Sequence, residues 1–138
     1  MFKSSGKLIY SELPAIRLVV ELDPEIAAFY RSLIPPHICY SIPMYPPHIS
    51  VVRREVPLNM EMWNKYTGLE VSFEYDNYVF IGLLYIWLKV YSNTLEDIRE
   101  ELGLPRHRSN VTRPPDESPC FHTTIANFKS SRRDLNTG

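Results

Sequence analysis

The feature that most constrains the fold of this chain is an alternation of apolar and polar side chains in two stretches. Between residues 69 and 75, apolar side chains alternate with Glu70, Ser72 and Glu74. Between residues 84 and 91, two sets of side chains alternate: Leu84, Ile86, Leu88 and Val90, and Tyr85, Trp87, Lys89 and Tyr91. Because successive side chains of a strand point to opposite faces of a sheet, this period predicts strands.

Three further segments have the signals of helices. Residues 23–34 combine an N-cap at Asp23, a proline at the first helical position and apolar residues at helical spacing. Residues 57–66 are expected to form a short helix. A helix is also predicted over residues 94–102, with Thr94 opening a sequence that resembles a capping box and a glycine just after its end.

The remaining segments complete a mixed fold. Strands are predicted over residues 15–22, 48–53, 69–75, 79–91 with an interruption at Gly82, and 120–128. Residues 105–119 are expected to form a long polar loop, and residues 129–138 a flexible tail. The order β-α-β-α-β-β-α-β predicts one α+β domain over residues 1–138, with a mainly antiparallel sheet.

Composition narrows the classes of partner. The chain has 15 basic and 16 acidic residues and a formal charge of −1. Because it has no global surplus of basic residues that would favour binding of long nucleic acid, a small anionic ligand is the better expectation. Residues 1–7 lack the apolar core that is expected of a secretory signal, and the longest apolar run, residues 79–88, is too short to span a membrane. Cys39 and Cys120 match neither a disulfide framework nor a zinc motif. We therefore expect a cytoplasmic protein with both thiols buried.

Three His-x-Ser/Thr tripeptides occur, although composition alone leads to about half a match by chance. They are His48-Ile49-Ser50, His107-Arg108-Ser109 and His122-Thr123-Thr124. The first and third lie in predicted strands, whereas the second lies among polar residues and prolines and is expected to be a solvated loop. A lone strand histidine is usually a half-buried, hydrogen-bonded side chain. The equivalent strand contexts of His48 and His122, 74 residues apart, instead suggest two halves related by duplication.

The spacing of these tripeptides suits the cleavage of a phosphodiester. Side chains at i and i+2 of a strand share a face and lie about 6.5 Å apart. One histidine can take a proton from the attacking oxygen and the other can protonate the leaving oxygen. Ser50 and Thr124 can donate hydrogen bonds to the non-bridging oxygens. No third ligand at zinc-site spacing accompanies His48 and His122, so a metal-free reaction without cofactors is expected.

The sequences Pro47-His48-Ile49-Ser50-Val51 and Phe121-His122-Thr123-Thr124-Ile125 resemble the paired signature of the two-histidine (2H) phosphoesterase superfamily. Within it, residues 1–10, 73–75 and 95–103 look most like the bacteriophage anti-CBASS phosphodiesterases. The resemblance implies a bilobal α+β fold, with two mainly antiparallel sheets, pseudo-twofold symmetry, a central cleft and helices outside. It also implies metal-independent hydrolysis of 3′–5′ bonds in cyclic di- or trinucleotides, such as 3′,3′-cGAMP, which would protect a phage from CBASS immunity. The family residues carried over are His48, Ser50, His122 and Thr124, with Ser50 standing where Thr is more frequent.

Four further residues are candidates for substrate binding. Trp87 lies on the polar-aromatic face of residues 84–91 and could stack on a base, although that face could equally be covered by a helix. Tyr10 is a second stacking candidate, with packing at a domain edge as the alternative. Arg108 could contact phosphates from the loop, with simple solvation as the alternative. Asn127 could bind a base or ribose, or it could end the strand.

Two other functions remain open from the sequence. The same four residues could act on RNA 2′,3′-cyclic phosphates or RNA ends, because only the shape of the site separates these substrates from cyclic messengers. A non-catalytic module that sequesters the messenger is a third hypothesis, which the two intact histidines disfavour. The sequence assigns neither the base and acid roles of His48 and His122 nor the oligomeric state.

Overall fold

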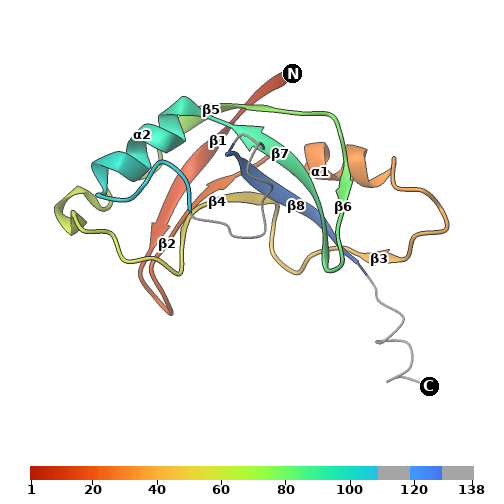
Figure 1. The fold of residues 1–138 in the computed structure, drawn as a ribbon, viewed down its shortest axis with the longest axis horizontal. Helices are drawn as coiled ribbons and strands as arrows, with labels where there is room; N and C mark the ends of the chain where they lie inside the picture. Colours follow the sequence, from red (N-terminus) through yellow and green to blue (C-terminus); the bar gives the residue numbers. More distant parts are fainter. Residues whose placement is uncertain (109–118, 129–138) are drawn as a thin grey trace.

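A computed structural model of the chain describes residues 1–108 and 119–128, and Figure 1 shows its fold. The strands are β1 (Phe2–Ser11), β2 (Arg17–Glu21), β3 (Tyr40–Ser41), β4 (His48–Arg53), β5 (Glu70–Tyr75), β6 (Phe80–Ile81), β7 (Tyr85–Tyr91) and β8 (Phe121–Phe128). The helices are α1 (Pro24–Arg31), the short 3₁₀ helix η1 (Met60–Met62) and α2 (Asn93–Glu101). The fold is therefore α+β, as predicted.

All eight strands belong to one sheet in the order β3-β8-β4-β2-β1-β5-β7-β6. An additional pairing of β8 with β7 closes six of them into a barrel. Each pairing between these strands is antiparallel. The expectation of two sheets is corrected in this respect: β1 pairs with both β2 and β5, which joins the strands into a continuous sheet.

The two α-helices follow the sequence signals closely. The Asp23 carboxylate accepts a hydrogen bond from the Glu25 amide, 3.0 Å away, which caps α1 as predicted. In α2 the N-cap is Ser92, whose hydroxyl accepts from the Leu95 amide, so the predicted cap at Thr94 is two residues too late. Gly103, with a φ of 83°, follows the end of α2 in the left-handed conformation that favours glycine.

Two expectations about secondary structure are wrong. Residues 57–66 form only the single turn η1, because Trp63 has an extended backbone and Asn64 a positive φ of 68°. Strand β1 was not predicted, since the polar run at its start lacks an apolar alternation. Yet β1 is central to the sheet, where it connects β2 with β5.

Each α-helix covers its own hydrophobic core. In the first core, the apolar stripe of α2 packs against buried side chains from β1, β2, β4, β5, β7 and β8. The predicted stripe residues Leu95, Ile98 and Leu102 are all buried there. In the second core, Ala27 and Tyr30 of α1 pack against β7 and β8. The two helices lie toward opposite ends of the molecule in Figure 1.

Other expectations have mixed outcomes. Cys39 is exposed and Cys120 is half-buried, so the prediction of two buried thiols is wrong. The helices found in residues 1–108 and 119–128 are too short to cross a membrane. Most of the predicted 105–119 loop and the whole predicted tail lie outside the described residues.

Gly6 lets β1 approach β2 closely. A Cβ atom at this position would lie 2.1 Å from the Glu21 carbonyl oxygen and 2.7 Å from a Val20 methyl. Backbone must move to relieve such an overlap, so we expect Gly6→Ala to lower the free energy of unfolding by more than about 1 kcal/mol. Urea unfolding monitored by circular dichroism measures this change. The exposed neighbour Ser5→Ala is the control, and equal midpoints for the two variants would contradict the prediction.

Candidate active site

The two histidine tripeptides lie side by side on adjacent antiparallel strands. Ile49 of β4 is paired with Thr123 of β8. Extending this antiparallel register by one residue in each direction sets His48 opposite Thr124 and Ser50 opposite His122. Directly opposed residues have Cβ atoms about 4.5–5.5 Å apart. Each tripeptide therefore places its histidine beside the hydroxyl residue of the other.

All four side chains lie on the same face of the sheet. Ile49 and Thr123, the middle residues of the tripeptides, are buried on the other face with exposures of 0% and 3%. Because the side chains of a strand alternate between faces, His48 and Ser50 project away from the core, and so do His122 and Thr124. We call the face that carries these four residues the motif face.

The neighbouring strands add further polar groups to the motif face. On one side, β7 pairs Trp87 with Thr124 and Lys89 with His122. On the other side, β2 pairs Val19 with Ser50 and Glu21 with His48. Since paired residues of antiparallel strands share a face, each tripeptide is flanked by one charged and one large or branched side chain. The Lys89 ammonium also lies 4.7 Å from the centre of the Phe80 ring.

A β-bulge follows each tripeptide at the same position. In β4, Ser50 is opposite Val19 and Val52 is opposite Leu18, so Val51 is the extra residue. In β8, Thr124 is opposite Trp87 and Ala126 is opposite Ile86, so Ile125 is the extra residue. Each bulge puts two consecutive side chains into the core: Val51 and Val52, and Ile125 and Ala126. A bulge re-aims the residues that follow it, and many bulges lie next to functional sites.

The bulges bring two more residues to the motif face. Arg53 lies five residues beyond His48, and Asn127 five residues beyond His122. In a regular strand, an odd separation would put each of them on the opposite face from its histidine. The extra residue of each bulge shifts the alternation by one position, so Arg53 and Asn127 share the face of their histidines. Arg53 is paired with Arg17, and Asn127 is paired with Tyr85.

An arginine from a helix holds each bulge by its carbonyl group. The Arg99 Nη1 atom of α2 donates to the Val51 carbonyl oxygen over 2.8 Å. The Arg31 Nη1 atom of α1 donates to the Ile125 carbonyl oxygen, also over 2.8 Å. A bulge leaves the extra residue outside the regular ladder, and these bonds satisfy its carbonyl group with a charged donor. The two halves of the site are therefore built in the same way.

Arg99 is fully buried, and each of its three side-chain nitrogens has a partner. Its side chain is 1% exposed, and Nη1 and Nη2 bind the two oxygens of Glu55 over 2.8 and 2.9 Å. Its Nε atom donates to the Pro105 carbonyl oxygen over 2.8 Å. Burial raises the pKa of the Glu55 carboxyl, but the hydrogen bonds and charge of Arg99 outweigh burial, so this pKa is lowered. The ionised pair fixes the end of β4 that carries Arg53.

The surroundings of the two histidines favour different protonation states. The pKa of His122 is lowered, first because protein atoms displace water from the ring, and then because the charges of Arg53 and His48 disfavour imidazolium. The residue as a whole is still solvent-exposed, and the positive charge of Arg53 lowers the pKa of His122 in the same direction as burial. The Nδ1 atom of His48 lies 2.9 Å from the Pro46 carbonyl oxygen. Because a carbonyl oxygen only accepts, Nδ1 carries the proton, which leaves Nε2 for proton transfer.

The four candidate binding residues divide into two groups. Trp87 and Asn127 lie on the motif face, and the Trp87 ring is stacked on Phe80 with centroids 5.7 Å apart. Tyr10 does not reach this face: it is paired with the buried Leu18, and its ring packs against Trp63. Val19 shares the motif face with Ser50 and is paired with Ile9, so the odd positions of β1 lie on this face and Tyr10 lies on the other. The expectation of base stacking by Tyr10 is therefore corrected.

The loop histidine differs from expectation, whereas the loop arginine is exposed, as simple solvation predicts. His107 is not solvated: its side chain is 13% exposed, its Nε2 atom lies 2.6 Å from a Glu96 carboxylate oxygen, and its ring packs against Phe121. Arg108 is exposed, and its charge helps to lower the pKa of Glu55. Arg108 lies in a loop outside the strands that build the motif face, and its contact with phosphates stays a prediction.

Sequence reasoning missed Arg53 and Arg31. A signal for Arg53 is present, because both tripeptides are followed by two consecutive apolar residues, which break the period of a strand. Two such breaks at equivalent positions indicate paired bulges, and hence a change of face for the residues that follow. No local signal marks Arg31, whose partner Ile125 lies 94 residues away in the chain.

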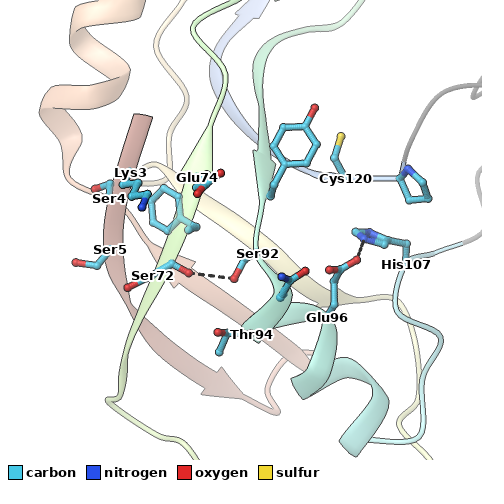
Figure 2. A pocket seen from close by; sticks show the side chains of 14 residues that line it. Lys3, Ser4, Ser5, Ser72, Glu74, Ser92, Thr94, Glu96, His107 and Cys120 are labelled. Carbon is cyan, nitrogen blue, oxygen red and sulfur yellow. Dashed lines mark hydrogen bonds and ion pairs between the residues drawn. The ribbon is translucent and has the colours of Figure 1, made fainter. Parts of the chain in front are cut away.

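Two cavities lie outside the strand pairs themselves. The larger, of about 750 Å³, lies around β1, β5 and the start of α2, and Figure 2 shows its lining. It contains the hydrogen-bonded pair of His107 and Glu96 but no residue of the two tripeptides. The smaller, of about 320 Å³, lies between α1 and residues 42–47 and is lined in part by Thr124. The smaller cavity therefore adjoins the motif face.

Comparison of the chain with protein-family models, with curated proteins and with solved structures gives no match. Within residues 1–108 and 119–128, no cluster of three or more histidine, cysteine or acidic side chains is arranged to hold a metal ion.

The placement of Arg53 can be tested through the titration of His122. Arg53→Gln removes a positive charge that disfavours the imidazolium, so we expect the pKa of His122 to rise toward the ordinary histidine value. NMR of the histidine ring protons across pH measures this directly and needs no substrate. The adjacent exposed Arg54→Gln is the matched control and should leave the titration unchanged. Equal His122 pKa values in both variants would remove Arg53 from the site.

The role of Arg99 can be tested by unfolding experiments. Arg99→Met leaves the Glu55 carboxylate without its buried partner, so we expect a loss of about 3–5 kcal/mol in the free energy of unfolding. Because the pKa of Glu55 is lowered in the folded protein, the stabilisation is present above the ordinary glutamate pKa. It is lost as pH falls through the lowered folded value. The difference between wild type and variant should thus shrink in acid to the part that comes from the lost Val51 and Pro105 hydrogen bonds, and a difference independent of pH would refute the ion pair.

Proposed function

We propose that this chain is a metal-independent phosphodiesterase that hydrolyses the 3′–5′ bonds of cyclic di- or trinucleotide immune messengers, such as 3′,3′-cGAMP. The observation that carries the proposal is the register of β4 and β8, which sets His48 beside Thr124 and Ser50 beside His122. Two proton-transfer groups and two hydroxyl donors thus surround an area of the size of one phosphate. In this proposal a phage uses the enzyme to evade CBASS defence.

The chemistry follows from the surroundings of each histidine. With its lowered pKa, His122 is neutral near pH 7 and is suited to take the proton from the attacking water or 2′-hydroxyl. The attacking oxygen forms a bond to phosphorus, and the bond from phosphorus to the 5′-oxygen breaks. His48 takes part in this step as the imidazolium, with its Nδ1 proton donated to the Pro46 carbonyl. It gives its Nε2 proton to the departing 5′-oxygen and is left neutral with its proton on Nδ1. Ser50 and Thr124 donate hydrogen bonds to the non-bridging oxygens.

Arg53 and Lys89 supply positive charge on the same face. Lys89 is the cross-strand neighbour of His122, and Arg53 acts electrostatically on the same histidine. A phosphate passing through a more highly charged transition state is stabilised by fixed cations close to it. In this arrangement, Arg53, which disfavours imidazolium at His122, also attracts the substrate.

We further infer that the barrel is the bilobal, pseudo-twofold arrangement of the two-histidine phosphoesterases. The order strand, helix, strand occurs twice, as β2-α1-β4 and β7-α2-β8, with β3 added in the first half. Three features repeat in the two halves: the register beside the tripeptide, the bulge after it and the helix arginine on the bulge carbonyl. Two separate cores, each covered by one helix, also support two lobes.

Base recognition fits the aromatic side of the site. Trp87 is the direct neighbour of Thr124, and Tyr85 is the neighbour of Asn127. A base–aromatic stack contributes about 1–3 kcal/mol. A cyclic messenger presents a base next to each phosphate, so a tryptophan beside the phosphate position supports a nucleotide substrate over a simple phosphoester.

Substitution of the histidines tests the mechanism. We expect His48→Ala and His122→Ala each to lower turnover by at least about 10²-fold with the fold intact, because each removes one proton-transfer group. Initial rates with 3′,3′-cGAMP in the presence of a chelator measure the effect. His37→Ala, which alters a histidine outside the paired tripeptides, is the matched control. Near-normal activity in either folded tripeptide variant would exclude that histidine from the mechanism.

A substrate panel separates this function from its rivals. The protein is incubated with 3′,3′- and 2′,3′-cyclic dinucleotides, cyclic trinucleotides and RNA ending in a 2′,3′-cyclic phosphate. Linear products from the cyclic messengers support the proposal. Turnover of the RNA ends alone would transfer the assignment to RNA processing, and tight binding without turnover would favour a sequestering module.

A further inference from the structure

We propose that the cavity between α1 and residues 42–47 is a nucleotide subsite, in which Tyr45 receives the base and Arg31 the phosphate. The inference rests on the proposed function and deepens it, because the cavity is lined by Thr124 and so continues from the motif face. Its volume of about 320 Å³ is at the lower end of the range for ligand sites, about 300–1,000 Å³. It fits one nucleotide unit of a larger substrate.

The two helix arginines differ in how far their charge is neutralised. Arg99 and Arg31 hold equivalent bulge carbonyls, but Arg99 is also neutralised by Glu55. In the part of the chain that the structure describes, no carboxylate forms an ion pair with Arg31. Arg31 is half-buried and lines the cavity, with only Nη1 used by the Ile125 carbonyl. A guanidinium in this state can bind a phosphate with its remaining donors.

An exposed apolar surface lies at the same cavity. Ile42, Met44 and Tyr45 are 67%, 89% and 66% exposed, and all three line the cavity. A cluster of exposed apolar side chains marks a binding surface more often than isolated ones do. A tyrosine beside a methionine offers the flat and adaptable surface that a nucleobase requires.

Residues 43–47 form a stiff segment that also contacts a catalytic candidate. Pro43, Pro46 and Pro47 fix the backbone on both sides of Tyr45, which lowers the entropy lost when a ligand binds. The carbonyl of Pro46 also accepts the hydrogen bond from His48 Nδ1. A nucleotide in the cavity would therefore contact the segment that orients one of the two histidines.

The larger cavity is a weaker candidate for the same ligand. Figure 2 shows two carboxylates, Glu74 and Glu96, and one ammonium, Lys3, among its lining side chains. Carboxylates repel a phosphate, and the Glu96 carboxylate already binds His107. The charge of the lining thus favours the smaller cavity for an anionic ligand.

Equilibrium binding of AMP and of ribose 5-phosphate tests the subsite without turnover. We expect Tyr45→Ala to weaken AMP binding by about 5- to 150-fold while leaving ribose 5-phosphate unaffected, because only the base stacks. Arg31→Met should weaken both ligands. Phe29→Ala, which removes an exposed aromatic side chain from the same helix, is the matched control and should change neither.

The outcomes separate this subsite from the proposed function. Failure of the wild type to bind AMP, or an unchanged AMP affinity in Tyr45→Ala, would overturn the subsite even if cyclic messengers are cleaved. The expected pattern without any cleavage would support the subsite and refute the phosphodiesterase. Arg31 also binds the bulge carbonyl of Ile125, so thermal unfolding is used to check that Arg31→Met is folded. If this variant unfolds, the AMP affinity of Tyr45→Ala alone tests the subsite, because Tyr45 does not bind a bulge.

Discussion

The motif face depends on one interaction that occurs twice: a helix arginine donating to the carbonyl of a bulge residue. Arg99 holds Val51 and Arg31 holds Ile125, each over 2.8 Å. Because the bulge adds one residue, the side chains after it change faces, and a polar residue comes to lie on the face of the histidine. Without a charged donor, the freed carbonyl near the core would be left unsatisfied, at a cost of about 1–3 kcal/mol. The helices thus fix both the cores and the chemistry of the site.

The two halves of the site differ in the charges that surround this interaction. On the β4 side, Glu55 neutralises Arg99 in an ion pair, and the strand continues to the cation Arg53. On the β8 side, the arginine has no carboxylate partner among the described residues and faces a cavity, and the strand continues to the neutral Asn127. A symmetric framework therefore carries an asymmetric distribution of charge. That asymmetry gives the two histidines different surroundings and lets them serve as base and acid in the proposed reaction.

Much of the secondary structure could be predicted from local signals. The alternation in residues 84–91 predicted β7 and its faces, and the cap at Asp23 predicted the start of α1. Strand β1 could not be predicted, because its order comes from pairing on both edges and from the close approach at Gly6. The helix expected over residues 57–66 failed for a related reason: its apolar pattern serves loop packing against the first core.

The sequence by itself determined that each histidine shares a face with its hydroxyl partner, because two-residue spacing in a strand is a local property. It also identified Trp87 and Asn127 as neighbours of the site. Only the tertiary structure decided that β4 and β8 are adjacent and in the register that opposes His48 with Thr124. The structure also decided that Tyr10 packs against the first core, that Arg53 reaches the motif face and that Arg31 binds the bulge of β8. These outcomes depend on hydrogen bonds between residues far apart in the chain, which no local pattern specifies.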